Sequence, residues 1–139
     1  MIDRQALQDH IPHREPFLWI DRVEHVEPGV RCVAFKFIDP AEPFFAGHFP
    51  ENPVLPGVFV IEAMAQTAGV MLGSATGGAC VALLAGVNRF KFLKTIAPGS
   101  ELRIETRTLV STGKMALVEG TVEVAGEVVA RGELSVVRP

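Results

Sequence analysis

The sequence predicts an α+β fold in which an antiparallel β-sheet wraps around one long hydrophobic helix. One helix-like run, residues 57–73, has a high density of alanine, methionine and leucine and no internal proline. After residue 73 the chain contains strand-like runs separated by turn sequences, with few helix signals. Because the helix is apolar on every face, we expect it at the centre of the fold, where the sheet covers it.

Size and composition indicate that residues 1–139 form one globular domain. Hydrophobic residues make up 48% of the chain and charged residues 21%, a composition that excludes intrinsic disorder. The net charge of −3 lacks the basic excess that nucleic-acid binding requires. Cys32 and Cys80 have no CxxC spacing, so we expect two buried free thiols.

The elements before the helix follow from local signals. Residues 3–10 predict a short helix that is capped by Asp3 and ends before Pro12. Residues 17–26 and 31–38 are rich in β-branched and aromatic residues and predict two strands. Residues 39–56 contain five prolines and one glycine, which predicts a long irregular loop of the kind that often carries function.

The elements from the helix onward complete the sheet. The helix begins after Pro56. Five strand-like runs follow it, at 80–87, 89–96, 101–110, 114–124 and 127–137. Residues 67–87 carry no charge over a length that could span a bilayer, but the glycines at 73, 77 and 78 predict a turn within them. We therefore expect no membrane span, and since the N-terminus lacks a signal-like apolar run, we expect a cytoplasmic protein.

Glu62 is the only charged side chain between residues 52 and 88. It lies in the middle of a helix that has no polar face. Burial of an unpaired carboxylate costs several kcal/mol, so its presence there needs a reason. Gln66 lies one turn later on the same face, where its amide can hydrogen-bond the carboxyl group. A carboxyl group in such surroundings is a candidate general acid or base.

A second candidate, His48, comes from the loop before the helix. The sequence Gly47-His48-Phe49-Pro50 places an imidazole between a flexible residue and a rigid one. The loop ends at Gly57, where the free N–H groups of the helix N-terminus present a partial positive charge. Together these features indicate a base, an acid and a site for a developing oxyanion.

Residues 47–66, GHFPENPVLPGVFVIEAMAQ, resemble the active-site signature of the (3R)-hydroxyacyl-acyl-carrier-protein dehydratases of type II fatty-acid synthesis. Residues 11–23 resemble that family's N-terminal segment, and residues 98–102 resemble the residues that lead into one of its later strands. The resemblance therefore covers nearly the whole chain. It implies the hot-dog fold, which agrees with the helix and sheet inferred from the residues.

The resemblance also implies roles for individual residues. His48 is expected to be the catalytic imidazole and Glu62 the catalytic carboxyl group. The Gly57 N–H would bind the thioester carbonyl, the Val54 carbonyl would orient the His48 ring, and Gln66 would hold Glu62. The implied activity is dehydration of a 3-hydroxyacyl thioester to a trans-2-enoyl thioester, with no metal or organic cofactor. The implied assembly is a homodimer that shares its active sites, and trimers of such dimers occur in the family.

The implied partner is an acidic acyl carrier protein, which presents its substrate on a phosphopantetheine arm. Arg89, Lys91 and Lys94 are the best candidates for its docking surface, since no acidic residue lies between them. A solvated strand edge with basic residues is an equally common explanation of such a run. His10 and His13 are a weak metal motif, because a proline lies between them and no third ligand is evident.

Three other functions are compatible with these residues. A hot-dog thioesterase also keeps a carboxylate on its central helix, but it must activate water. A non-catalytic acyl-binding paralogue would have no need of both His48 and Glu62. A bifunctional enzyme would also isomerise the trans-2 product to the cis-3 isomer, a property that depends on the shape of the active-site tunnel that the resemblance implies.

Overall fold

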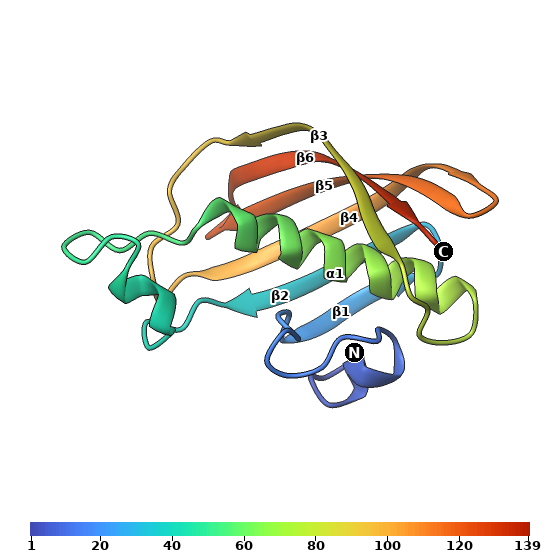
Figure 1. The fold of residues 1–139 in the computed structure, drawn as a ribbon, viewed down its shortest axis with the longest axis horizontal. Helices are drawn as coiled ribbons and strands as arrows, with labels where there is room; N and C mark the ends of the chain where they lie inside the picture. The colour runs from blue at the N-terminus through green and yellow to red at the C-terminus, as the bar shows by residue number, and fades with distance from the viewer.

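In the computed structural model, which describes residues 1–139, the chain forms one six-stranded antiparallel sheet around a single α-helix (Figure 1). The sheet order is β1-β2-β4-β5-β6-β3, so β1 and β3 are its edges. The strands are β1 (Arg22–Glu27), β2 (Arg31–Phe37), β3 (Leu83–Phe92), β4 (Glu101–Thr112), β5 (Met115–Val124) and β6 (Glu127–Val137). The expected fold class is confirmed.

Helix α1 (Gly57–Ala75) runs across the face of the sheet, as Figure 1 shows. Its core side includes Met64 and Met71, which are fully buried. A Cβ at Gly120 of β5 would clash with the Met64 side chain, so this glycine lets helix and sheet approach closely. By length and composition α1 could cross a membrane, yet half of its most apolar window is buried inside this fold.

The first elements differ from expectation in length. The N-terminal turn is a 3-10 helix, η1 (Ala6–Asp9), and Asp3 Oδ1 accepts a hydrogen bond from the Ala6 N–H at 2.8 Å. Strand β1 begins at Arg22 instead of residue 17. The reason is that the backbone N–H of Trp19 bonds the Gln66 side chain at 2.8 Å instead of a neighbouring strand.

The two strands predicted at 80–87 and 89–96 are one strand, β3, and that part of the prediction is wrong. No turn separates them; the pairing with β6 shifts register between Asn88 and Lys91, and Arg89 has φ 51°. A β-bulge therefore absorbs the irregularity within a continuous strand. The outer edge of β3 has no partner in this chain, and its Leu83, Leu84 and Val87 are exposed.

The proline-rich segment 39–56 forms the expected loop, with one 3-10 turn, η2 (Pro43–Ala46). The Leu55 N–H donates to the Ile96 carbonyl at 2.8 Å, which ties the end of this loop to the segment after β3. Cys32 is buried as expected, and burial raises the pKa of its thiol to about 12. Cys80 is only partly buried, because it lines a cavity beside α1.

Candidate active site

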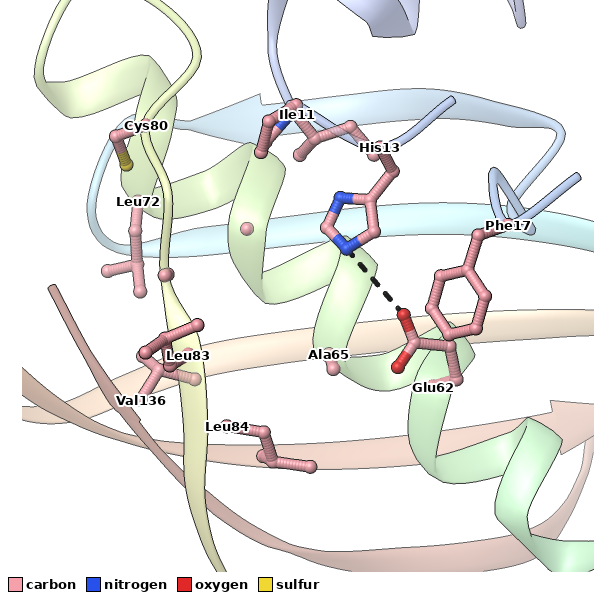
Figure 2. A pocket seen from close by; sticks show the side chains of 13 residues that line it. Ile11, His13, Phe17, Glu62, Ala65, Leu72, Cys80, Leu83, Leu84 and Val136 are labelled. Atoms are coloured by element: carbon pink, nitrogen blue, oxygen red, sulfur yellow. Dashed lines mark ion pairs between the residues drawn. The ribbon is translucent and has the colours of Figure 1, made fainter. Parts of the chain in front are cut away.

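Glu62 lies in the first half of α1 with 24% of its side chain exposed. It is therefore partly buried in the single chain, not enclosed as the sequence suggested. Figure 2 shows its carboxyl group at one end of a cavity of about 160 Å³ beside α1, which we call the inner cavity. The walls of the inner cavity are mostly apolar: Ile11, Pro12, His13, Phe17, Glu62, Ala65, Gly69, Leu72, Cys80, Ala82, Leu83, Leu84 and Val136.

A second hollow of about 220 Å³, which we call the outer cavity, also reaches Glu62. It is lined by Pro16, Phe17, Trp19, Val58, Phe59 and Glu62. Glu62 and Phe17 line both cavities. The carboxyl group is thus shared by two largely apolar spaces, and apolar walls with a few polar groups are typical of ligand sites.

Gln66 is fully buried and fixes the position of Glu62. Its Oε1 accepts from the N–H of Trp19 at 2.8 Å and faces the N–H of Ile20 at 3.4 Å. Its Nε2 donates to the Phe17 carbonyl at 2.8 Å and to Glu62 Oε1 at 2.9 Å. This one amide therefore ties the segment before β1 to α1 and holds the carboxyl group.

His13 is a site residue that the sequence reasoning considered only as a metal ligand. Its Nε2 lies 3.7 Å from Glu62 Oε1 (Figure 2). Its ring stacks on Phe17, with centroids 6.1 Å apart and planes at 15°. No local sequence signal connects residues that lie 49 positions apart. In the described chain, no three His, Cys, Asp or Glu side chains are grouped so as to hold a metal ion.

His48 lies on the loop that leads to α1. Its Nδ1 is 2.9 Å from the Val54 carbonyl, and the Val54 N–H donates back to the His48 carbonyl at 3.1 Å. Since a carbonyl oxygen can only accept, this contact requires a proton on Nδ1 and leaves the lone pair of Nε2 free. The ring also packs on Phe49 with centroids 4.3 Å apart. Neither cavity beside Glu62 is lined by His48 of the same chain.

Gly57 is the first residue of α1, so its N–H belongs to the first turn of the helix and has no acceptor within it. A Cβ at this position would lie 2.8 Å from Cζ of Phe92. The Phe92 ring, at the end of β3, therefore packs against the start of the helix. Only glycine leaves this contact unstrained.

The structure brings two of the three candidate docking residues together. Arg89 and Lys91 line a surface recess with Arg131, because Lys91 pairs with Arg131 across β3 and β6. None of these three cations forms an ion pair within the chain, although Glu119 and Glu133 also line the recess. Lys94 instead forms an ion pair with Glu127. Arg131 was missed because the strand pairing is not visible in the sequence.

The model of the FabA-like domain family matches residues 11–133. The 3-hydroxyacyl-[acyl-carrier-protein] dehydratase FabZ of Geobacillus thermodenitrificans is 44% identical, over 96% of this chain and 93% of that protein. The enzyme of the same name from Bacillus subtilis is 40% identical, over 97% of this chain and 96% of that protein.

Among solved structures, the dehydratase heterocomplex ApeI:P from Xenorhabdus doucetiae superposes with a TM-score of 0.80 at 23% identity. The match covers 96% of this chain and 90% of that one. This similarity supports the shared fold.

Proposed function

Because the chain belongs to the FabA-like family and has 3-hydroxyacyl-[acyl-carrier-protein] dehydratases among its relatives, we propose that it dehydrates (3R)-3-hydroxyacyl-acyl-carrier-protein to the trans-2-enoyl product in fatty-acid biosynthesis. The observation that carries the proposal is the Glu62 carboxyl group, held by Gln66 and shared by two largely apolar cavities. We assign His48 and Glu62 as the catalytic pair of one domain, residues 1–139. The reaction belongs in the cytoplasm.

The reaction needs removal of a weakly acidic proton from C2 and expulsion of a poor leaving group from C3. Nε2 of His48 is the base, because its lone pair is free while Nδ1 is engaged with the Val54 carbonyl. Glu62 is the acid that gives its proton to the leaving hydroxyl group. The Glu62 proton and the C3 hydroxyl group leave as one water molecule. The C2 proton stays on His48, which becomes protonated. Transfer of that proton back to Glu62 restores the enzyme.

The thioester carbonyl gains negative charge as C2 loses its proton. The Gly57 N–H, at the positive end of α1, is the donor that meets this charge. Removal of one such donor typically slows an enzyme about 10²–10³-fold. The thioester itself accepts the electron pair from C2, so the mechanism calls for no cofactor.

We propose that each active site is shared between two chains. Within one chain His48 lines neither cavity beside Glu62, so a second chain has to supply it. The unpaired edge of β3, with Leu83, Leu84 and Val87 exposed, is the surface that a second copy would cover. A homodimer formed there would bring a His48 loop from each chain to the Glu62 of the other. Such dimers could assemble further into a trimer of dimers.

The carrier docks at the surface formed by Arg89, Lys91 and Arg131, none of which forms an ion pair with the nearby Glu119 or Glu133. Acyl carrier proteins are acidic, so three unpaired cations supply the attraction that the net charge of −3 does not. Lys94 contributes less, since Glu127 already neutralises it.

The test is an assay with purified protein and 3-hydroxyacyl- or trans-2-enoyl-acyl-carrier-protein substrates of several lengths, followed by enoyl absorbance and by product analysis. We expect interconversion of hydroxyacyl and enoyl thioesters. His48→Ala and Glu62→Gln should each lower kcat by about 10²–10⁴-fold while the protein stays folded. Release of free acid and thiol, without enoyl product, would instead identify a thioesterase.

A further inference from the structure

We propose that His13 is a positioning residue which, together with Gln66, binds Oε1 of Glu62, so that Oε2 is the oxygen that carries the proton exchanged with the substrate. This inference rests on the proposed dehydratase function and adds a division of labour between the two oxygens of the catalytic carboxyl group.

The hydrogen bonds of Gln66 fix the orientation of its side-chain amide. The backbone N–H of Trp19 lies 2.8 Å from one side-chain atom of Gln66, and only the carbonyl oxygen can accept from it. The NH₂ group must then be the atom 2.9 Å from Glu62 Oε1. Glu62 Oε1 therefore faces one N–H donor whose direction is fixed by a fully buried side chain.

The surroundings of the His13 ring determine its tautomer. Its Nδ1 is buried and has no hydrogen-bond partner, while its Nε2 points at Glu62 Oε1. A proton on Nδ1 would leave a buried donor unsatisfied and would turn the Nε2 lone pair toward the carboxylate. A proton on Nε2 avoids both penalties. His13 therefore carries a proton on Nε2, and this N–H is directed at Glu62 Oε1.

Contacts with neighbouring residues hold His13 in place. Its ring stacks on Phe17, and the neighbouring Ile11 is completely buried. The Arg14 guanidinium donates to the carbonyls of Ile11 and Gln8 at 3.0 and 3.1 Å, which closes this segment on itself. The 3.7 Å between His13 and Glu62 exceeds hydrogen-bond length, so in the free chain the attraction is electrostatic. Catalytic contacts of this kind tighten when substrate binds.

The two oxygens of the Glu62 carboxyl group therefore have different roles. Oε1 faces two N–H donors and acts as the acceptor oxygen, so in the neutral acid the proton sits on Oε2. Figure 2 shows Oε1 turned toward His13 and the other oxygen turned away from it. During dehydration the Oε2–H bond breaks, the proton joins the C3 hydroxyl, and the C–O bond breaks to release water. The two donors then stabilise the charge left on the carboxylate.

The test compares three substitutions at residue 13. His13→Gln keeps an N–H donor at a reach similar to that of Nε2, His13→Asn keeps one near the position of Nδ1, and His13→Ala keeps none. We expect His13→Ala to lower kcat about tenfold with less than a twofold change in KM. His13→Gln should recover to within about threefold of the original kcat, and His13→Asn should not. His25→Ala, which removes an exposed histidine paired with Glu27, is the control.

Three results would overturn the inference. Equal kcat for the Gln and Asn variants would show that the position of the donor is unimportant. A raised KM with unchanged kcat would make His13 part of the cavity wall alone. A kcat unchanged in all three variants would remove His13 from the reaction. Absence of dehydratase activity in the original protein would instead contradict the proposed function. Thermal unfolding of each variant excludes loss of the fold as the cause.

Discussion

Replacement of Gly57 by alanine tests whether the start of α1 takes part in catalysis. The added Cβ would lie 2.8 Å from Phe92 Cζ, about 0.6 Å short of the 3.4 Å at which ordinary contact begins. We expect relief of this contact to move the start of α1, and with it the Gly57 N–H, away from the ring. A displacement of about 1 Å at a reacting centre can cost about 10²-fold in rate. We therefore expect Gly57→Ala to lower kcat about 100-fold.

The same change should hardly alter the melting temperature, because the ring is half exposed and alanine favours a helix more than glycine does. Turnover is measured by enoyl absorbance with saturating substrate. Gly78→Ala adds the same methyl group where no heavy atom lies within 4 Å, and it should leave kcat unchanged.

A double variant separates strain from loss of the donor. Alanine at residue 57 keeps its backbone N–H, so removal of the opposing ring in Gly57→Ala/Phe92→Ala should restore most of the turnover lost by Gly57→Ala. The Phe92→Ala single variant supplies the reference. A near-normal kcat for Gly57→Ala, or no recovery in the double variant, would refute the placement of the thioester carbonyl at this N–H.

Two further predictions concern charges outside the reacting groups. The Arg31 guanidinium holds the pKa of Glu105 down to about 2, so Glu105 stabilises the fold above about pH 4.5, and this contribution disappears as the pH falls toward 2. Urea unfolding should show Glu105→Gln less stable by about 1–3 kcal/mol at pH 7, the full shift being reduced by solvent screening, and the gap should close as the pH falls toward 2. A gap independent of pH would contradict this. Arg89→Glu, Lys91→Glu and Arg131→Glu should each raise KM for carrier-bound substrate, and the KM of the unmodified protein should rise with salt, whereas a short carrier-free thioester should be unaffected. Equal effects on both substrates would remove this surface as the docking site.

The sequence was sufficient for the fold class because its two patterns are local. A helix without a polar face and a series of strand runs leave few ways to bury apolar surface. The bounds of β6 were predicted to the residue, since a glycine turn marks its start. The start of β1 was missed because the backbone N–H groups of Trp19 and Ile20 face the Gln66 side chain and not a neighbouring strand.

The candidate site was predictable to the extent that its residues share one segment. His48, Gly57 and Glu62 lie within 15 consecutive positions, so a single motif contains them. His13 and Arg131 reach the site and the docking surface from distant parts of the chain. His13 approaches Glu62 through the fold of the N-terminal segment, and Arg131 approaches Lys91 through strand pairing. Contacts of this kind need the tertiary structure.

The most direct test of the shared, two-residue site is complementation between two inactive chains. A His48→Ala chain and a Glu62→Gln chain are mixed under conditions of subunit exchange, and mixed dimers are demonstrated with distinguishable tags. A mixed dimer has one site with both groups intact and one with neither. Random exchange gives mixed dimers in half of the population, so turnover should recover to about a quarter of that of the unmodified protein. Mixed dimers without recovered turnover would contradict a site in which His48 and Glu62 come from different chains.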